Sequence, residues 1–356
     1  MQLFERIGVD DHEEVVYCHD RKSGLRAIIA LHSTRLGPAL GGTRFYPYES
    51  EDAALEDVLR LAKGMTYKAA AAGLDLGGGK AVVIGDPRTA KSEALLRAYG
   101  RFVETLARRY ITAEDVGTTQ ADMDIIRRET THVTGVSRWL GGSGDPSAAT
   151  AYGVFHAMKT TALACKGSNE LAERHVVVAG VGKVGTNLVR HLVEERCHVT
   201  VADVDEDAVD RVQRDFGVDT VPPEKAHALP CDIYSPCALG GALNADTIPE
   251  LRCWAIVGSA NNQLADASNV DLLARTDVLY APDFIVNAGG LINVAEELAG
   301  YHRERAYARV RRIYDTTLTL IQGARAEGIS TTAYAERMAE QRIDDIGRLV
   351  HITTFQ

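Results

Sequence analysis

The segment from His175 to Gly185 constrains the fold of this chain more than any other. An apolar run typical of a buried strand leads directly into three spaced glycines, and a helical pattern follows. Glycines in this arrangement allow a tight turn and a close backbone approach, and a helix start presents N–H groups to an anion. We therefore expect a strand–turn–helix unit that binds a diphosphate through Gly180, Gly182, Lys183, Val184 and Gly185.

A second strand-like run, from His198 to Ala202, ends in Asp203, about twenty residues after the glycines. A carboxylate at this place can accept a hydrogen bond from the 2′-hydroxyl of an adenosine ribose and repels a 2′-phosphate. The sequence therefore favours NAD over NADP as the cofactor, with Asp203 as a contact.

Further strand candidates follow at Asp232–Tyr234, Ala255–Gly258 and Val278–Ala281, and helical or loop sequence separates them. Strands that alternate with helices predict a parallel, doubly wound sheet, whose ligand lies beyond the carboxyl ends of the strands. The residues that follow these strands and that we expect to contact the cofactor are Cys237, Ala238 and Asn287.

Two lysines of the first half stand in apolar surroundings. Ser50 is a candidate N-cap, and a helix is expected from Glu51 to Gly73 with Lys68 on an apolar face. An unpaired ammonium there would cost several kcal/mol, so a bound carboxylate is a natural partner. Lys80 closes the run Gly77–Gly79, which predicts a turn where another group comes close, before the strand Ala81–Ile84.

The third notable residue is Asp115, at the end of a strand-like run. With the period of a strand, Ile111, Ala113 and Asp115 share one face, which leaves room for a ligand beside a carboxylate. Each of the three charged residues also has an ordinary interpretation: a surface lysine, a flexible glycine loop and a turn-forming aspartate. Spacing alone does not decide whether they meet.

Length, charge and cysteine content set further bounds. A chain of 356 residues predicts two domains, with a break at the glycine-rich stretch Arg138–Pro146. A net charge of −10 argues against nucleic acid or an anionic membrane as partner. No long apolar stretch and no signal peptide are apparent, so we expect a cytoplasmic protein. The six cysteines lack metal-ligand spacing, and no metal site is expected.

Five motifs taken together resemble the Glu/Leu/Phe/Val amino acid dehydrogenase family, and most closely its leucine- and valine-specific members. They are Leu40–Arg44, Lys63–Lys68, Gly77–Lys80, Ala113–Gly117 and Asn287–Gly290. The resemblance implies an α/β fold of two domains separated by a cleft. Residues 1–140 would form the substrate-binding and assembly domain, with a C-terminal helix at about 332–356 packing back on it, and 146–330 a Rossmann-type NAD-binding domain.

The resemblance also implies roles for individual residues. Lys68 would bind the substrate α-carboxylate, Lys80 would act as general base toward water, and Asp115 would shuttle protons at the amino group. A lysine base must lose its proton near neutral pH, which a neighbouring cation and exclusion of water favour. Asn262 would add a substrate contact, and Thr150 would contact the nicotinamide amide.

Apolar residues stand where glutamate-specific relatives hold a side-chain carboxylate with a lysine and a serine. The positions that match are Leu40 and Val294, and the expected pocket also includes Gly41, Met65, Ala113 and Leu291. The resemblance thus implies reversible oxidative deamination of leucine, valine and isoleucine to 2-oxo acids and ammonia by a homo-oligomer. The alternatives are a phenylalanine dehydrogenase and, from another class, a non-catalytic NAD-responsive binding protein.

Overall fold

The computed structural model describes residues 3–238 and 240–348, which fall into two compact α/β units. Of the described residues, the first unit comprises 3–145, 294–303 and 339–348, and the second comprises 146–238, 240–293 and 304–338. The short segment from Val294 was expected in the NAD-binding domain but belongs to the first unit. Within the described residues, no helix is long and apolar enough to cross a membrane.

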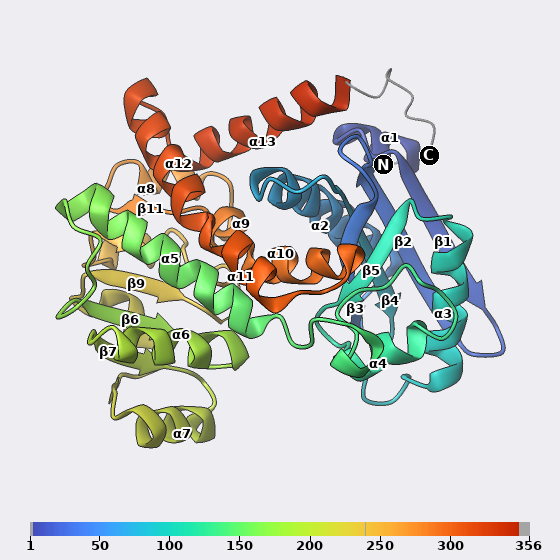
Figure 1. Ribbon diagram of the computed structural model, residues 1–356, viewed down its shortest axis with the longest axis horizontal. Coiled ribbons are helices and arrows are strands. Elements are labelled where there is room, and N and C mark those ends of the chain that lie inside the picture. The colour runs from blue at the N-terminus through green and yellow to red at the C-terminus, as the bar shows by residue number, and fades with distance from the viewer. Residues whose placement is uncertain (1–2, 239, 349–356) are drawn as a thin grey trace. The chain divides into compact units, whose positions relative to one another are not determined.

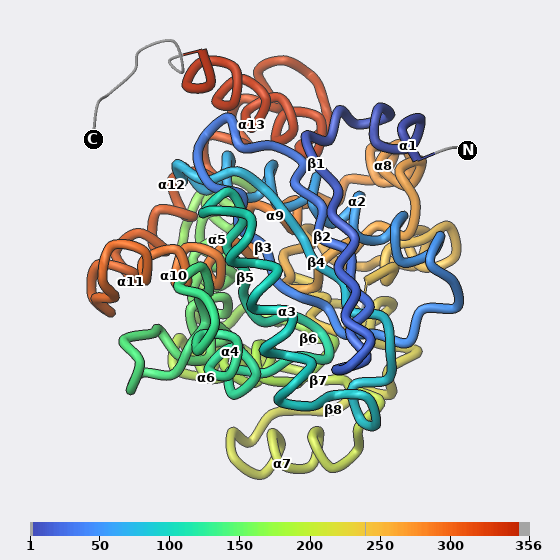
Figure 2. Tube along the Cα trace, turned by 90° about the vertical axis from the view of Figure 1, so that its right-hand side faces the viewer, coloured from blue at the N-terminus to red at the C-terminus, as the bar shows by residue number. Residues whose placement is uncertain are grey.

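A five-stranded mixed sheet forms the centre of the first unit, in the order β1-β2-β4-β3-β5 (Figure 2). β1 pairs with β2 and β2 with β4 in antiparallel fashion, whereas β3 is parallel to both β4 and β5. The elements of this unit are α1 (Leu3–Val9), β1 (Glu14–Asp20), β2 (Leu25–Ser33), β3 (Ala39–Tyr46), α2 (Glu51–Ala71), β4 (Gly77–Ile84), α3 (Glu93–Thr105), β5 (Tyr110–Glu114), α4 (Gln120–Ile126), η1 (Arg138–Leu140) and η4 (Glu296–Ala299).

The two faces of this sheet are covered by different helices. α2 packs on Ile28, Ala30 and Val82, and α3 packs on the opposite face, where a larger apolar cluster contains Tyr99 and Tyr110. The predicted N-cap of α2 is confirmed, because the Ser50 hydroxyl accepts a hydrogen bond of 3.1 Å from the N–H group of Ala53. Side chains that share a face with Val82 therefore point toward the α2 side.

The predicted turn at Gly77–Gly79 is wrong, because these glycines begin strand β4. A Cβ added to Gly78 would lie 2.0 Å from the backbone nitrogen of Thr66 in α2. The expectation of a close approach at this place is confirmed, and the approaching group is the backbone of a helix. Contact between a helix and a sheet at this distance leaves no space for a side chain, which explains why glycine stands in a regular strand.

The second unit is built on a six-stranded parallel sheet in the order β11-β10-β9-β6-β7-β8, which is a Rossmann-type order with the first strand at the centre (Figure 1). The five predicted strands are confirmed. β8, which is short and exposed, was not predicted. The strands are β6 (His175–Ala179), β7 (His198–Ala202), β8 (Asp219–Thr220), β9 (Ile233–Pro236), β10 (Ala255–Ile256) and β11 (Leu279–Tyr280).

Helices of the second unit pack beside this sheet, and α5 contacts both α6 and α12 (Figure 1). The remaining elements are α5 (Ser147–Lys166), α6 (Lys183–Glu194), α7 (Glu206–Phe216), η2 (Pro223–Ala228), η3 (Ile248–Glu250), α8 (Asn269–Leu273), α9 (Asp283–Val286), α10 (Gly289–Ala295), α11 (Arg303–Arg311), α12 (Ile313–Glu327) and α13 (Thr331–Gly347). From Ala339 onward, α13 belongs to the first unit, where Ala339 and Ile343 pack on Leu36 and Ala70. Residues 349–356 of the expected C-terminal helix lie outside the described residues.

Candidate active site

Lys80 and Asp115 form an ion pair in the first unit, with 3.0 Å between the Nζ and Oδ2 atoms. Register explains why they meet. Lys80 of β4 lies two residues before Val82 and therefore faces the α2 side. Strand β3 separates β4 from β5, and its Gly42 lies opposite Ala113 of β5. Asp115 follows Ala113 by two residues. The Lys80 side chain is only 7% exposed and that of Asp115 is 19% exposed. A buried ammonium and a carboxylate thus share a site that the sequence could only suggest.

Lys68 lies in the last turn of α2 and is partly buried. The contact between Thr66 and Gly78 fixes this turn against β4. Lys68 follows Thr66 by two residues on the helix, and Lys80 follows Gly78 by two residues on the strand. The structure therefore places Lys68 on the helix that covers the Lys80 face of the sheet.

Asp115 is held in its ionised form by two cations. Burial alone would raise the pKa of its carboxyl group, but the charges of Lys80 and Arg44 outweigh this effect and lower the pKa below its ordinary value. The Arg44 Nε atom donates to Asp115 Oδ2 at 3.1 Å. The backbone N–H of Asp115 donates to Thr118 Oγ1 at 2.9 Å, so a tight turn also fixes the residue. The turn-forming interpretation of Asp115 is confirmed, and its role in a catalytic site stays a prediction.

The apolar residues expected around a substrate side chain are placed as follows. Leu40 and Ala113 are buried, and by register they share the sheet face of Lys80, while Met65 is partly buried on α2. Gly41 allows a close approach, because a Cβ there would lie 1.7 Å from the carbonyl oxygen of Gly79. Leu291 and Val294 are buried in α10, with Leu291 in the second unit and Val294 in the first.

The glycine-rich turn of the second unit shows the geometry that the sequence predicts. Gly180 has φ of +112°, and a Cβ there would lie 2.5 Å from the backbone nitrogen of Ala238, so the turns after β6 and β9 touch. A Cβ on Gly185 would lie 1.9 Å from the carbonyl oxygen of Gly180. Gly182, in contrast, faces open space and is the N-cap of α6 without any side-chain capping bond. This helix start, which includes Lys183 and Val184, fits a diphosphate.

Asp203 follows β7 and touches the same turn. Its Oδ2 atom accepts a hydrogen bond of 2.7 Å from the N–H of Val181, and its Oδ1 atom accepts one of 3.0 Å from the N–H of Asp205. A carboxylate has about four acceptor positions, so lone pairs remain for a ribose hydroxyl. The next acidic residue, Asp205, caps helix α7.

Asn287 is 5% exposed and contributes a buried acceptor to the second unit. Its Nδ2 atom donates to the Ser259 carbonyl oxygen at 3.1 Å and to Asn261 Oδ1 at 2.9 Å. Its Oδ1 atom has no hydrogen-bond partner within residues 3–238 and 240–348. A buried amide oxygen without a donor is costly, and a ligand amide would satisfy it. The residue is the C-cap of α9.

Of the other predicted contacts of the second unit, Cys237 and Asn262 lie in loops that follow its strands, and Thr150 lies in a helix. Cys237 Sγ lies 3.4 Å from Ser235 Oγ, directly after β9. Asn262 is exposed with φ of +52°. Thr150 lies in the first turn of α5, where its hydroxyl donates to the carbonyl oxygen of Pro146 at 3.1 Å, and Gly290 packs against it. Thr150 and the helix that begins at Gly289 are thus neighbours.

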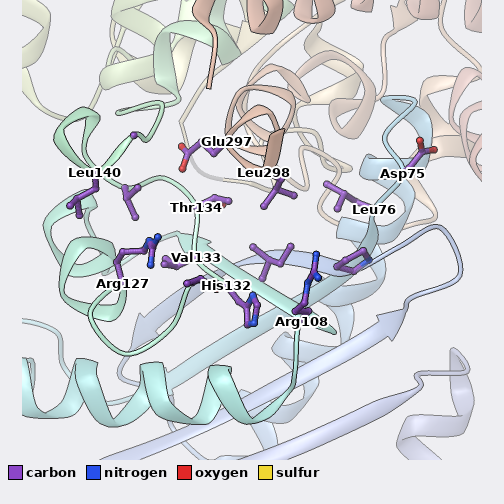
Figure 3. A pocket seen from close by; sticks show the side chains of 15 residues that line it. Asp75, Leu76, Arg108, Arg127, His132, Val133, Thr134, Leu140, Glu297 and Leu298 are labelled. Atoms are coloured by element: carbon purple, nitrogen blue, oxygen red, sulfur yellow. The ribbon is translucent and has the colours of Figure 1, made fainter. Parts of the chain in front are cut away.

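A separate pocket of about 600 Å³ lies in the first unit (Figure 3). Arg108, Arg127, His132 and Glu297 line it, and none of the proposed catalytic residues does. Burial raises the pKa of Glu297, whose carboxylate accepts hydrogen bonds from backbone N–H groups, including one of 2.7 Å from Ser143. This carboxylate therefore holds a loop.

In the part of the chain that the structure describes, no group of three His, Cys, Asp or Glu residues could hold a metal ion.

Both units match domains of known proteins. Residues 12–132 match the model of the Glu/Leu/Phe/Val dehydrogenase dimerisation domain, and residues 141–211 and 204–318 match the Glutamate/Leucine/Phenylalanine/Valine dehydrogenase model. The chain belongs to this amino acid dehydrogenase family. It is 53% identical to leucine dehydrogenase of Bacillus cereus, over 96% of this chain and 94% of that protein. It is 54% identical to valine dehydrogenase of Streptomyces coelicolor, over 93% and 92%.

Solved structures of relatives share the fold of this dehydrogenase. L-tryptophan dehydrogenase from Nostoc punctiforme has a TM-score of 0.84 and 44% identity, over 97% of this chain and 99% of that one. Glutamate dehydrogenase from Thermus thermophilus has a TM-score of 0.78 and 26% identity, over 96% and 91%. The predicted resemblance and the predicted class of fold are therefore confirmed.

Proposed function

We propose that this amino acid dehydrogenase catalyses the reversible, NAD-dependent oxidative deamination of leucine, valine and isoleucine to 2-oxo acids and ammonia. The observation that carries the proposal is the Lys80–Asp115 ion pair on a sheet face that also bears the apolar residues Leu40 and Ala113. Relatives named leucine and valine dehydrogenases match nearly the whole chain at just over half identity.

Each charged residue has one role in the proposed reaction. Lys68 binds the substrate α-carboxylate and orients the amino acid. Bound NAD supplies the acceptor for the hydride that leaves Cα. Lys80 takes a proton from the water that adds to the resulting iminium carbon, and Asp115 moves a proton to the departing amino group. The buried position of the Lys80–Asp115 pair strengthens these interactions, because a site poor in water has a low effective dielectric constant.

The residues of the second unit fit the cofactor. The α6 start at Gly182, Lys183 and Val184 would bind the diphosphate, with Gly180, Gly185, Cys237 and Ala238 shaping the turn around it. Asn287 Oδ1 and Thr150 would hold the nicotinamide amide, and Asp203 would bind the adenosine ribose. Asn262 is the proposed additional substrate contact.

The proposed role of Asp203 predicts a change in cofactor preference. In an Asp203→Ala variant we expect kcat/KM for NAD to fall about tenfold or more, because a charge-assisted hydrogen bond contributes about 1.5–3 kcal/mol. Activity with NADP should stay equal or rise, because the repulsion of a 2′-phosphate is removed. Initial rates with both cofactors measure this. An unchanged ratio of NAD to NADP activity would remove Asp203 from the ribose site.

The side chain of the substrate is selected by apolar residues. Leu40, Met65, Ala113, Leu291 and Val294, beside the narrow backbone at Gly41, would leave a side-chain carboxylate buried without a partner, at a cost of several kcal/mol. One methylene changes discrimination by only about 1–3 kcal/mol, so the three branched-chain amino acids should all be substrates. A preference for aromatic substrates is the second candidate, because a relative at 44% identity is named L-tryptophan dehydrogenase.

A panel of amino acids tests the proposed function. We expect NADH formation with leucine, valine and isoleucine, and kcat/KM for glutamate lower by about 10³-fold or more, as a buried unpaired charge dictates. A kcat/KM for phenylalanine or tryptophan above all three branched-chain substrates would favour the second candidate. NAD binding without turnover of any amino acid would identify a non-catalytic binding protein.

We further propose that the enzyme assembles from several copies of this chain. The matched model of the first unit describes a dimerisation domain, and the relative from Thermus thermophilus is described as hetero-hexameric. β1 is an edge strand of the first unit's sheet and offers unpaired backbone groups for such an assembly.

A further inference from the structure

Asp115 stands at one end of a chain of alternating charges that continues away from Lys80. Arg44 donates through Nε to Asp115 at 3.1 Å and through Nη1 to Asp57 Oδ2 at 2.9 Å. Tyr48 donates its hydroxyl to the same Asp57 oxygen at 2.6 Å, and Arg60 donates to Asp57 Oδ1 at 2.8 Å. The guanidinium of Arg44 therefore bridges two carboxylates.

The fold puts these groups together through register and helix spacing. Arg44 pairs with Val82 across β3 and β4, so it projects toward the α2 side, as Lys80 does. Asp57 lies in the second turn of α2, which packs on that face. The side chains of Arg44 and Asp57 are only 21% and 15% exposed, so solvent screens their interaction weakly.

Both partners of Arg44 are held as ions. Burial would raise the pKa of Asp57, but the hydrogen bond from Tyr48 and the charge of Arg44 lower it below its ordinary value. Burial and the hydrogen bond to Asp57 in turn raise the pKa of Tyr48, which stays a phenol donor. The charge of Arg44 is thus divided between Asp57 and Asp115, and Asp115 is shared between Arg44 and Lys80.

We propose that Asp57 and Tyr48 hold Arg44 so that it positions Asp115 against Lys80 and limits how strongly it binds the Asp115 carboxylate. Arg44, Asp57 and Tyr48 are positioning residues for the reaction, and this inference rests on the proposed function. A proton-shuttling carboxylate must both accept and release a proton, so a guanidinium that bound it alone would trap the ionised form. Asp57 prevents this by competing for Arg44.

The proposal gives opposite signs for two variants. Asp57→Asn frees Arg44 to act fully on Asp115, so the acid limb of kcat/KM should move to lower pH, by about half to one pH unit. Arg44→Gln removes the cation, so the limb should move to higher pH by a similar amount. In both variants we expect kcat for leucine to fall about tenfold and KM to change less than threefold, because no direct substrate contact is lost.

The acid limb also reports the other groups that face Asp115. These are Lys80 from β4 and Arg44 from β3, and Lys68 and Asp57 lie on the covering helix α2, while Tyr110 of β5 lies on the opposite face of the sheet. The side chains of Lys80, Lys68 and Tyr110 are the same in both variants, so each shift of the limb follows from the change made at Asp57 or at Arg44. A general loss of packing would lower kcat without moving the limb in two directions.

Three further variants serve as a control, a rescue and an independent test. Asp86→Asn makes the same substitution in an exposed local pair with Arg88 and should leave kinetics and pH profile as in the wild type. Asp57→Glu should restore much of kcat, because it keeps the carboxylate. Tyr48→Phe removes a competing donor from the Asp57 oxygen that Arg44 binds, so Asp57 should hold Arg44 more strongly and the limb should move to higher pH, less far than in Arg44→Gln. This variant tests the network even if a variant at Asp57 fails to fold.

The outcomes separate the inference from the function on which it rests. Opposite shifts with partial rescue by Asp57→Glu support the positioning role. Wild-type turnover of leucine combined with unshifted profiles in Asp57→Asn, Arg44→Gln and Tyr48→Phe overturns the inference and leaves the proposed function intact. Absence of turnover by the wild-type protein over the whole amino acid panel overturns both.

Discussion

Replacing Lys80 by alanine should lower kcat for leucine oxidation about 10³-fold, within the range of about 10²–10⁴ that general acid–base catalysis contributes. Lys80 is the group proposed to take a proton from the attacking water, and it touches Asp115 at 3.0 Å. Arg44, the other cation on Asp115, cannot replace it, because a guanidinium does not lose its proton in proteins. KM for leucine should change little, since Lys68, the proposed ligand of the substrate carboxylate, is unchanged.

The Lys80→Ala variant should remain folded, which makes its kinetics interpretable. The Asp115 carboxylate keeps its ion pair with Arg44, so this buried charge does not lose all of its partners, and the backbone N–H of Asp115 keeps its hydrogen bond to Thr118. Lys91→Ala is the matched control, because it removes a partly buried lysine that lies 2.6 Å from Asp122, and it should retain wild-type kcat. A Lys80→Ala enzyme with kcat within tenfold of the wild type and an unchanged acid limb would contradict the base assignment.

Two candidate site residues that the sequence singled out, Lys80 and Asp115, meet in the structure, whereas the local structure expected before Lys80 was wrong. The βαβ unit with Gly180 and Asp203 was predictable because strand period, glycine spacing and an acidic strand end act together over a short stretch. Lys80 and Asp115 were singled out because charged residues stood in apolar patterns. Their contact depends on strand β3, which lies between them in the sheet although it precedes both in the sequence.

The groups that the sequence analysis missed are those whose meaning depends on nonlocal pairing. Arg44 stands two residues after Gly42 in a resembling motif, and the period of a strand would have put it on the face of Ala113 once that pairing was known. Asp57 looks like one more acidic residue of an exposed helix, and only the packing of α2 on the sheet turns it toward Arg44. Local pattern carries no information on such a contact.

The second prediction concerns the stability of the fold and the glycines of β4. Gly78→Ala should destabilise the first unit by about 3 kcal/mol, because overpacking costs about 1–3 kcal/mol and here the clash at 2.0 Å involves the helix backbone. A side chain could rotate away from the added methyl group, whereas the N–H of Thr66 moves only if α2 shifts as a whole. The melting temperature should fall by roughly 6–12 °C, measured by circular dichroism at fixed protein concentration and scan rate.

Gly64→Ala on the same helix should act in the opposite direction. Gly64 is exposed within α2 and an added Cβ meets nothing within 4 Å, so the substitution should stabilise the helix by about 0.5–1 kcal/mol. Kinetics discriminate further, because Gly78→Ala displaces the turn that carries Lys68 and should raise KM for leucine, while Gly64→Ala should not. Equal melting temperatures for the two variants would mean that α2 does not rest on β4 at Gly78, and the last turn of α2, which carries Lys68, would then not be fixed against β4.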